Sequence, residues 1–251
     1  MSPLPAALVE ALDAAVASQR LLVASDFDGT LAPIVNDPAA ARALPDAADA
    51  LVALADQPSV SVALISGRAL ATLRELSAMP SSVALVGSHG AEFDTGFAND
   101  VDEALLRRIV DELTAIADGR PGVAVETKLA SVALHVRNAS DSDGEAALAE
   151  AREAARSWDA EITAGKKVLE FAVVSTDKGE AVDILRDRAD ATAVVFFGDD
   201  VTDEKAFARM RDGDVGVKVG QGETLARYRI DSPDDVASAL AYLLDTLSRR
   251  S

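Results

Sequence analysis

The two ends of the chain alternate short apolar runs with segments that repeat apolar residues at helical spacing. Leu21–Ser25, Val60–Ile65 and Val83–Gly87 are nearly uninterrupted apolar runs of strand length, whereas residues 5–19 follow the helical period. This alternation predicts a parallel sheet with crossover helices. The same patterns predict further strands at Ala193–Phe197 and Val215–Val219, and helices at Ala47–Ala55, from after the turn Ser66-Gly67-Arg68 to about Ala78, at Asp203–Arg211 and at Asp234–Leu247.

The middle of the chain has a different pattern, in which helices are followed by strands that alternate apolar and polar residues. The elements expected there are, in order, a helix over Val101–Ile116, strands at Val123–Thr127 and Val132–Arg137, a helix over Gly144–Trp158, and strands at Glu161–Ala164 and Val168–Val173. One helix and two strands, occurring twice, predict a small α+β unit at 94–171. It would be inserted into a larger core formed by 1–93 and 172–251.

Composition narrows the classes of function. The 251 residues are 49% hydrophobic and 26% charged, as in ordinary globular proteins, and the net charge of −18 argues against nucleic acid or an anionic membrane as partner. The absence of cysteine excludes disulfides, thiolate zinc sites and a thiol nucleophile. No apolar stretch reaches the roughly 18 residues of a membrane span, and the first residues lack a basic leader. We therefore expect a cytoplasmic protein, a monomer with a small-molecule substrate.

Four polar clusters fall at the carboxyl ends of predicted strands or at the starts of helices, where open α/β sheets bind their ligands. They are Asp26 with Asp28, Ser66-Gly67-Arg68, Lys178-Gly179 and the acidic stretch 199–204. Each alone has an ordinary structural explanation as a turn, a helix cap or a solvated charge. Their joint occurrence at these positions favours a shared chemical site.

The chemistry that these clusters permit together is phosphoryl transfer. A carboxylate such as Asp26 can attack phosphorus and form an aspartyl-phosphate, while Asp28 could protonate the leaving oxygen and later accept a proton from water. Attack of one anion on another requires a cation, and oxygens of Asp26, of Asp199 and of a backbone carbonyl near Asp28 are suited to Mg²⁺. The Ser66 hydroxyl and the Lys178 ammonium would hold the phosphoryl oxygens.

The order of these residues resembles the four motifs of the haloacid dehalogenase superfamily of phosphatases. More narrowly, the chain from about residue 20 to 220 resembles the trehalose-6-phosphate phosphatase family. The stretches that carry the resemblance are Asp26-x-Asp28-Gly29-Thr30, Ser66-Gly67-Arg68, Gly87-Ser88-His89-Gly90-Ala91-Glu92, Leu134-His135-Val136-Arg137, Gly165-Lys166-Lys167-Val168-Leu169-Glu170, Asp177-Lys178-Gly179 and Gly198-Asp199-Asp200-Val201-Thr202-Asp203-Glu204. The resemblance implies an α/β fold with a Rossmann-like parallel-sheet core and an inserted α+β cap domain.

The resemblance also implies roles for individual residues. Asp26 would be the nucleophile and Asp28 the acid and base of a Mg²⁺-dependent phosphatase that hydrolyses trehalose 6-phosphate through an aspartyl-phosphate. Asp26, Asp199 and the backbone of Asp28 would bind the metal, with Asp200 and Asp203 behind these ligands. The phosphate would be bound by Ser66, Gly67, Arg68 and Lys178, and the sugar by His89 and Glu92 of the core and by Lys128, Arg137, Lys166 and Glu170 of the cap.

Two alternatives concern the function. The substrate could be another sugar phosphate, such as sucrose 6-phosphate or mannosyl-3-phosphoglycerate. A signalling module phosphorylated on Asp would use a similar set of residues, but such modules are shorter and keep their aspartyl-phosphate. The inserted unit and the second carboxylate, Asp28, favour a hydrolase. Arg68 could bind phosphate or pair with an acidic neighbour.

Further alternatives concern the cap. His135 could be a packed strand histidine, and Glu126 with Lys128, on one face of a strand, could form a surface ion pair. Lys166 and Lys167 are expected on a strand and so would point in opposite directions. Only one of them should then reach the substrate, and the resemblance favours Lys166.

Overall fold

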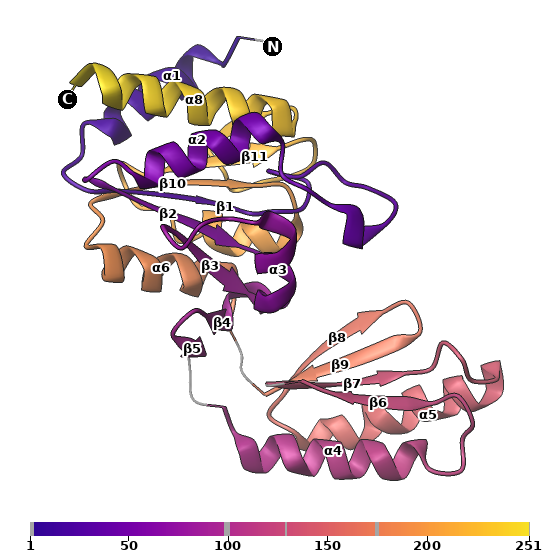
Figure 1. Cartoon of the computed structure of the whole chain (residues 1–251). Helices are drawn as coiled ribbons and strands as arrows, with labels where there is room; N and C mark the ends of the chain where they lie inside the picture. Colours follow the sequence, from indigo (N-terminus) through magenta and orange to yellow (C-terminus); the bar gives the residue numbers. More distant parts are fainter. Residues whose placement is uncertain (1–2, 98–100, 129, 174–175, 251) are drawn as a thin grey trace. The chain divides into compact units, whose positions relative to one another are not determined.

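The computed structural model describes residues 3–97, 101–128, 130–173 and 176–250. The chain forms two compact units, Met1–Ala98 with Thr176–Ser251, and Asn99–Ser175 (Figure 1). The second unit thus begins five residues later and ends four residues later than the predicted insertion at 94–171. The later start has a local reason, because strand β5 (Gly96–Phe97) pairs with β4 (Glu92–Phe93), which pairs with β3 (Val83–Gly87) of the first unit.

The first unit is built on an eight-stranded sheet in the order β12-β11-β10-β1-β2-β3-β4-β5. Neighbouring strands are parallel from β12 to β3, and β4 and β5 add an antiparallel edge. The other parallel strands are β1 (Leu21–Ser25), β2 (Val60–Ile65), β10 (Ala193–Gly198), β11 (Val215–Val219) and β12 (Tyr228–Ile230). The predicted parallel sheet is confirmed. Strands β4, β5 and β12 were not predicted, because two or three residues are too few to form an apolar run.

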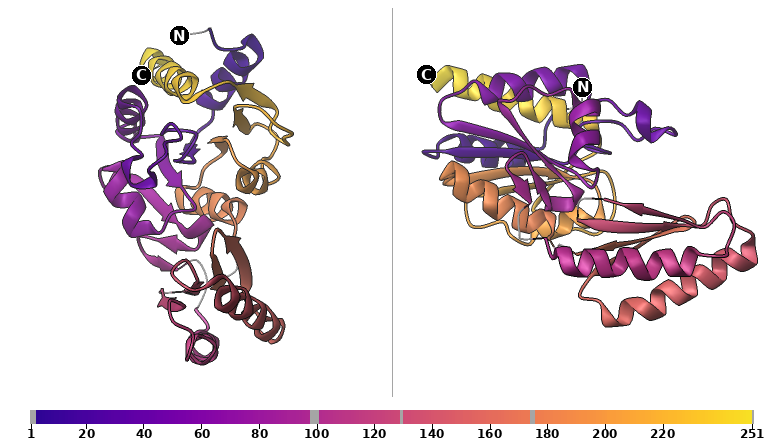
Figure 2. Two further views of the ribbon diagram at one scale, coloured as in Figure 1. Left: turned by 90° about the vertical axis from the view of Figure 1, so that its right-hand side faces the viewer. Right: turned by 60° about the horizontal axis from the view of Figure 1, so that its bottom comes forward.

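Helices cover both faces of this sheet (Figure 1). One core lies beneath α1 (Ala6–Val16), α2 (Pro45–Ala55), α3 (Leu70–Ser77) and α8 (Pro233–Arg250). The other core lies beneath α6 (Lys178–Ala189) and α7 (Glu204–Phe207), and successive residues of β1 point alternately into the two cores. Figure 2 shows the same layers from two further directions. None of the helices described is both long enough and apolar enough to span a membrane.

Helix α7 is a single turn, so the predicted helix over Asp203–Arg211 is confirmed only for Glu204–Phe207 and is wrong in its length. A 3-10 turn (Val201–Asp203) precedes it, and the backbone N–H of Arg211 donates to the Asp214 carboxylate at 2.7 Å. Gly213 then adopts a positive φ of 93°, which suits glycine and redirects the chain toward β11. The helix stops early because the Asp214 side chain binds a backbone donor that a longer helix would use.

The second unit has a sheet of its own, with the order β6-β7-β9-β8 and antiparallel pairing throughout. Its strands are β6 (Ala124–Thr127), β7 (Ser131–His135), β8 (Glu161–Gly165) and β9 (Val168–Ala172). Helices α4 (Glu103–Ala117) and α5 (Asp141–Ala154) cover one face of this sheet (Figure 1). The rings of Trp158 and Phe171 meet edge to face in the core between them, with centroids 5.1 Å apart.

Lys166 and Lys167 form the turn between β8 and β9, so the prediction that they lie on a strand is wrong. Gly165 and Val168 are the last paired residues of the two strands, which leaves the two lysines as the connection. Lys167 has a positive φ of 64°, and its Nζ lies 2.7 Å from Oδ1 of Asp141 at the start of α5. Strand alternation therefore does not decide where these two side chains point.

Candidate active site

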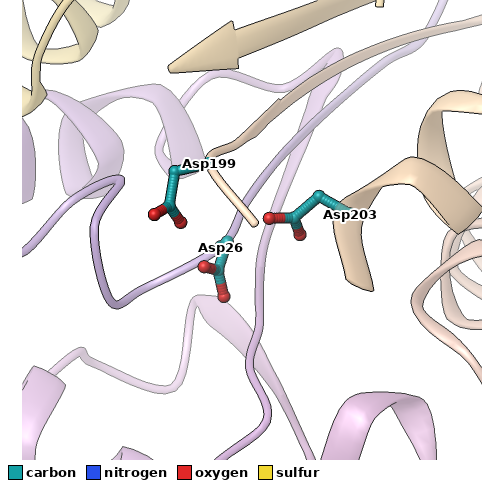
Figure 3. A group of neighbouring side chains, drawn as sticks. All are labelled: Asp26, Asp199 and Asp203. Carbon is teal, nitrogen blue, oxygen red and sulfur yellow. The ribbon is translucent and has the colours of Figure 1, made fainter. Parts of the chain in front are cut away.

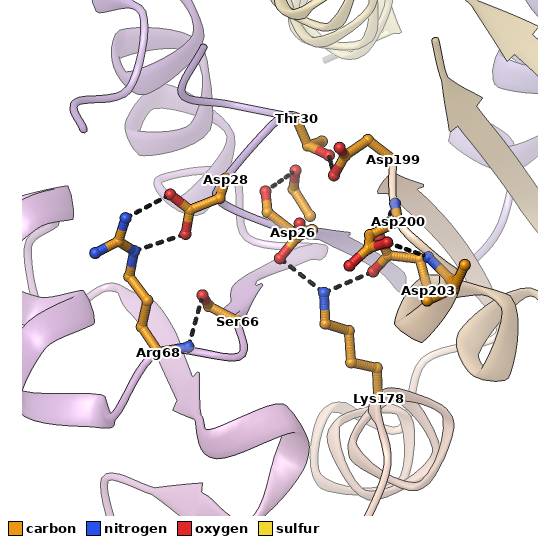
Figure 4. A network of polar contacts seen from close by, with 11 residues as sticks. Asp26, Asp28, Thr30, Ser66, Arg68, Lys178, Asp199, Asp200 and Asp203 are labelled. Carbon is orange, nitrogen blue, oxygen red and sulfur yellow. Dashed lines mark hydrogen bonds and ion pairs between the residues drawn. The ribbon is translucent and has the colours of Figure 1, made fainter. Parts of the chain in front are cut away.

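The polar clusters meet at the carboxyl ends of three adjacent strands. Strands β10, β1 and β2 are neighbours in the sheet, and Asp199, Asp26 and Ser66 follow their last residues directly. Lys178 comes from the first turn of α6 and reaches the same place (Figure 4). Parallel strands bring their carboxyl ends to one edge, which is why segments more than a hundred residues apart form one network.

A buried ammonium joins two carboxylates at the centre of this network. Lys178 Nζ lies 2.8 Å from Oδ1 of Asp26 and 2.8 Å from Oδ1 of Asp203. All three residues are nearly or fully shielded from solvent. Burial alone would lower the pKa of Lys178, but the two carboxylates outweigh it and raise this pKa. Lys178 is therefore a permanent cation beside Asp26.

Asp203 is fixed on both sides and faces inward from the short turn after β10. Its second oxygen, Oδ2, accepts the backbone N–H of Asp200 at 2.9 Å, and the Asp200 carboxylate in turn accepts the N–H of Val201 at 2.6 Å. A Cβ on Gly198 would come within 2.4 Å of the Asp203 side chain, so only glycine fits at the end of β10. Asp203 thus orients Lys178, while exposed Asp200 caps the turn.

Three carboxylates, those of Asp26, Asp199 and Asp203, each offer an oxygen within 4.8 Å of the others (Figure 3). Burial, with repulsion from Asp203, raises the pKa of Asp26 to about 8 although Lys178 opposes the shift. Burial, Asp203 and Asp200 also raise the pKa of Asp199. A cation bound here would relieve this repulsion.

The donor set fits Mg²⁺, which prefers carboxylate and carbonyl oxygens. Both oxygens of Asp203 already accept hydrogen bonds from Lys178 and the Asp200 backbone. The ligands from this group would therefore be Asp26 and Asp199.

Gly29 makes room for the carboxylate of Asp199. A Cβ at this position would lie 2.1 Å from Oδ2 of Asp199, and the backbone has a positive φ of 81°. The next hydroxyl, Oγ1 of Thr30, donates to Oδ1 of Asp199 at 3.3 Å. The glycine after the two aspartates is therefore required by both space and conformation.

Asp28 pairs with Arg68 through both of its oxygens, at 2.6 Å each (Figure 4). This paired hydrogen bond raises the pKa of Arg68. Arg68 could have bound phosphate or paired with an acidic neighbour. In the structure it pairs with Asp28, whose side chain points toward this arginine. Two parallel N–H···O bonds hold the carboxylate in a defined plane beside the site.

The turn after β2 presents a buried hydroxyl. Ser66 is 1% exposed and its Oγ accepts the N–H of Arg68 at 3.2 Å. A Cβ on Gly67 would come within 2.3 Å of the imidazole of His89, so the exposed ring of His89 lies against this turn. Glu92 accepts the N–H of Leu70 at 2.8 Å and the hydroxyl of Ser88 at 3.0 Å. Glu92 therefore stabilises the start of α3 and the loop that carries His89.

In the second unit, the face of the sheet opposite the helices carries a polar group. Glu170 Oε1 accepts hydrogen bonds from Lys128 Nζ and Ser131 Oγ, both at 2.7 Å. Glu126 pairs instead with half-exposed His135 at 2.8 Å. The alternatives of a Glu126–Lys128 ion pair and of a packed His135 are therefore both wrong. Arg137 and Lys166, also expected to bind the sugar, are exposed.

Lys218 is a part of the site that the sequence analysis did not identify. It lies in β11, where all five residues are buried, and is 4% exposed. Its Nζ donates a hydrogen bond to the backbone carbonyl of Asp199. The available signal was a single lysine inside an otherwise apolar strand, but only the pairing of β11 with β10 brings it to Asp199.

Comparisons with solved structures define the class. The chain superposes on the trehalose-6-phosphate phosphatase of Aspergillus fumigatus with a TM-score of 0.72 at 26% identity, covering 98% of this chain and 99% of that one. The C-terminal domain of the C. albicans trehalose-6-phosphate phosphatase gives 0.69 at 25% identity, with 98% of each chain covered. A haloacid dehalogenase-like hydrolase from Bacteroides thetaiotaomicron gives 0.65 at 14% identity, covering 92% of this chain and 100% of that one. The fold is that of the haloacid dehalogenase-like hydrolases.

Sequence comparisons define the family within this class. The trehalose-phosphatase family model matches residues 24–234. A trehalose-phosphate phosphatase of Mycobacterium avium is 36% identical over 93% of this chain, and that of Mycobacterium bovis is 37% identical over 94%. The chain spans only 64% and 65% of the lengths of these two relatives. The chain belongs to the trehalose-phosphatase family.

Proposed function

We propose that this chain hydrolyses trehalose 6-phosphate to trehalose and inorganic phosphate, through a phosphorylated Asp26. The observation that carries the proposal is the buried contact of Asp26 with Lys178, one strand from the Ser66 hydroxyl. A carboxylate held beside a fixed ammonium, with a hydroxyl at the end of the neighbouring strand, is suited to attack a phosphate monoester. The names of the related phosphatases support the choice of substrate.

The proposed reaction has two steps. In the first, a carboxylate oxygen of Asp26 forms a bond to phosphorus, the bond from phosphorus to the sugar oxygen breaks, and Asp28 gives that oxygen a proton. In the second, Asp28 takes a proton from water as the water oxygen bonds to phosphorus, and the bond to Asp26 breaks. Ser66 and Lys178 donate hydrogen bonds to the phosphoryl oxygens in both steps.

Mg²⁺ held by Asp26, Asp199 and the backbone of Asp28 would neutralise charge between the carboxylate and the phosphate. The raised pKa values of Asp26 and Asp199 support this requirement, because burial and the neighbouring carboxylate of Asp203 disfavour both anions, and a bound cation would offset these effects. Asp203 keeps Lys178 pointed at Asp26. Asp200 shapes the turn from which Asp203 reaches inward.

The Asp28–Arg68 pair adds a condition to this reaction. Both oxygens of Asp28 accept N–H groups of Arg68 in this pair, and a carboxylate is the form that accepts a proton from water. To donate a proton in the first step, at least one oxygen of Asp28 must leave Arg68. We propose that substrate binding loosens this pair and that Arg68, with Gly67, then contacts the phosphate.

Recognition of the sugar is proposed for the polar groups of the second unit. Lys128 and Glu170 form one hydrogen-bonded group with Ser131, and such groups can donate to and accept from sugar hydroxyls. Arg137 and Lys166 would add contacts from the same unit. In the first unit, His89 is a better candidate than Glu92. Both oxygens of Glu92 already accept hydrogen bonds, from the backbone N–H of Leu70 and from the hydroxyl of Ser88.

The test is release of inorganic phosphate from trehalose 6-phosphate, sucrose 6-phosphate, mannosyl-3-phosphoglycerate and glucose 6-phosphate, with Mg²⁺ or with EDTA. We expect Mg²⁺-dependent release that is fastest for trehalose 6-phosphate. D26N should abolish it, and D49N, which removes an exposed carboxylate of α2, should not. Preference for another substrate would overturn the specificity. An aspartyl-phosphate that survives for minutes after reaction with acetyl phosphate would favour a signalling module over a hydrolase.

A further inference from the structure

Strand β11 carries a buried charge that the proposed reaction does not use. Lys218 has apolar or glycine neighbours along β11, and the whole strand is buried. A buried ammonium costs free energy unless a polar group compensates for it. Its Nζ donates to the carbonyl oxygen of Asp199, the first residue after β10. The group that compensates for this buried charge is therefore a backbone atom of a residue in the candidate site.

The register of the sheet explains why Lys218 reaches this carbonyl. Lys218 is the partner of Gly198 in the parallel pair of β10 and β11. Asp199 therefore leaves the sheet beside Lys218, at the point where the regular hydrogen bonding of the strands ends. The lysine takes the place of a ladder donor for a carbonyl that the end of the strand would otherwise leave unpaired.

The other end of Asp199 is fixed independently. Its carboxylate accepts the hydroxyl of Thr30 at 3.3 Å and lies against Gly29, where no Cβ would fit. Lys218 holds the backbone of the same residue. With both ends held, the carboxylate is kept within reach of the Asp26 oxygen.

We infer that Lys218 is a positioning residue that holds Asp199 in the geometry needed to bind Mg²⁺. The inference rests on the proposed function in one respect, namely that the site binds Mg²⁺. It assigns no role to Lys218 in contacting the substrate. Groups that orient the ligands of a metal typically change its affinity about 10- to 100-fold when removed. Loss of Lys218 should therefore weaken Mg²⁺ binding more than it weakens substrate binding.

The experiment compares K218M, K218R and K205M with the unmodified chain. Met is unbranched, one atom shorter than Lys, and fits an apolar strand. Arg retains a donor, and K205M removes the same charge from an exposed position on α7. Mg²⁺ affinity is measured by isothermal titration calorimetry, without substrate. The melting temperature with EDTA measures folding. Steady-state hydrolysis of trehalose 6-phosphate gives the half-saturating Mg²⁺ concentration and KM.

We expect K218M to raise the dissociation constant of Mg²⁺ about 10- to 100-fold, with KM at saturating Mg²⁺ changed less than about twofold. K218R should recover part of the affinity, and K205M should bind Mg²⁺ like the unmodified chain. A K218M variant with unchanged Mg²⁺ affinity would overturn the inference, whatever its melting temperature. If K218M does not fold, K218Q takes its place, because its side chain is one atom shorter than that of Lys and carries no charge to the Asp199 carbonyl. Unchanged Mg²⁺ affinity in K218Q would then overturn the inference.

The calorimetric result separates this inference from the proposed function. If the unmodified chain binds Mg²⁺ but releases no phosphate from trehalose 6-phosphate, the proposed function fails, and weaker binding by K218M still supports the role of Lys218. If the unmodified chain does not bind Mg²⁺ at all, the inference is overturned, because there is no metal for Asp199 to hold.

Discussion

A buried ion pair behind the site gives a sharp test of what holds α6, and therefore Lys178, in place. Arg186 of α6 donates to both carboxylate oxygens of Asp214, and both side chains are almost fully buried. Asp214 also accepts the N–H of Val194 at 2.9 Å and that of Arg211 at 2.7 Å. One carboxylate thus joins α6 to β10 and to the turn before β11.

The expected magnitudes follow from this geometry. D214N leaves the guanidinium of Arg186 buried without a counter-charge, which should cost about 3–5 kcal/mol. R186M leaves the carboxylate of Asp214 with two backbone donors only and should cost a similar amount. The double variant removes both charges, so its cost should be no greater than that of either single variant. The buried Nε of Arg186, which has no hydrogen-bond partner among the described residues, adds to the cost of keeping the charge.

The assay is urea unfolding of the four chains in a double-mutant cycle, followed by circular dichroism. Trp158, the single tryptophan, belongs to the core of the second unit, so its fluorescence follows that unit separately. A loss of 3–5 kcal/mol corresponds to a decrease in melting temperature of about 6–20 °C for a chain of this size. Additive costs in the double variant, or a cost below about 1 kcal/mol for D214N, would refute the reasoning.

Three further predictions concern the site. The pKa of Asp26 is raised to about 8 in the folded state, so the stability of the metal-free chain should fall as pH rises from about 4 to about 8. Mg²⁺ should restore this stability. Melting temperatures measured across this pH range, with EDTA or with MgCl₂, test the two expectations. G29A should lose Mg²⁺ binding and activity, because its Cβ would lie 2.1 Å from Asp199 Oδ2; calorimetry and phosphate release measure this. K128M should raise KM for trehalose 6-phosphate about tenfold without changing hydrolysis of p-nitrophenyl phosphate, which lacks the sugar.

Each of these has a matched control. D26N should lose the part of the pH dependence that comes from Asp26, and an unchanged pH profile would contradict the assignment. G96A introduces a Cβ at a positive φ of 111° with nothing within 4 Å. It therefore measures the effect of backbone strain alone, whereas G29A adds a collision with the carboxylate of Asp199. K167M removes a lysine that pairs with exposed Asp141. An equal rise of KM in K167M and K128M would argue against a specific sugar contact.

The sequence pattern was sufficient for the long elements. β1, β2, β3 and β11 begin and end at the predicted residues, because a run of five or six mainly apolar residues has few alternatives to a buried parallel strand. The helix predicted over Asp203–Arg211 is shorter in the structure, because Asp214, farther along the chain, binds the Arg211 backbone. The lysines at 166 and 167 were misplaced because a turn of two residues leaves no periodic signal.

The sequence could not predict which side chains pair with one another, for a different reason. Arg68 could have bound phosphate or an acid, and the choice of Asp28 depends on how closely the ends of β1 and β2 approach. Lys128, which directly follows β6, pairs with Glu170 of β9 and not with Glu126 of β6. Such choices follow from distances of a few ångströms, which spacing along the chain does not specify.

By itself, the sequence determined that carboxylates, a hydroxyl and an ammonium follow apolar strands and would meet, because parallel strands end at one edge of a sheet. Only the tertiary structure decided how those groups are divided. In the fold, Lys178 and the backbone N–H of Asp200 donate hydrogen bonds to the two oxygens of Asp203. Asp26 and Asp199 are then the carboxylates left to bind a cation. The fold also brought Lys218 to the carbonyl of Asp199. The physical reason is that a carboxylate has only two oxygens, and the fold determines which donors lie within hydrogen-bond distance of them.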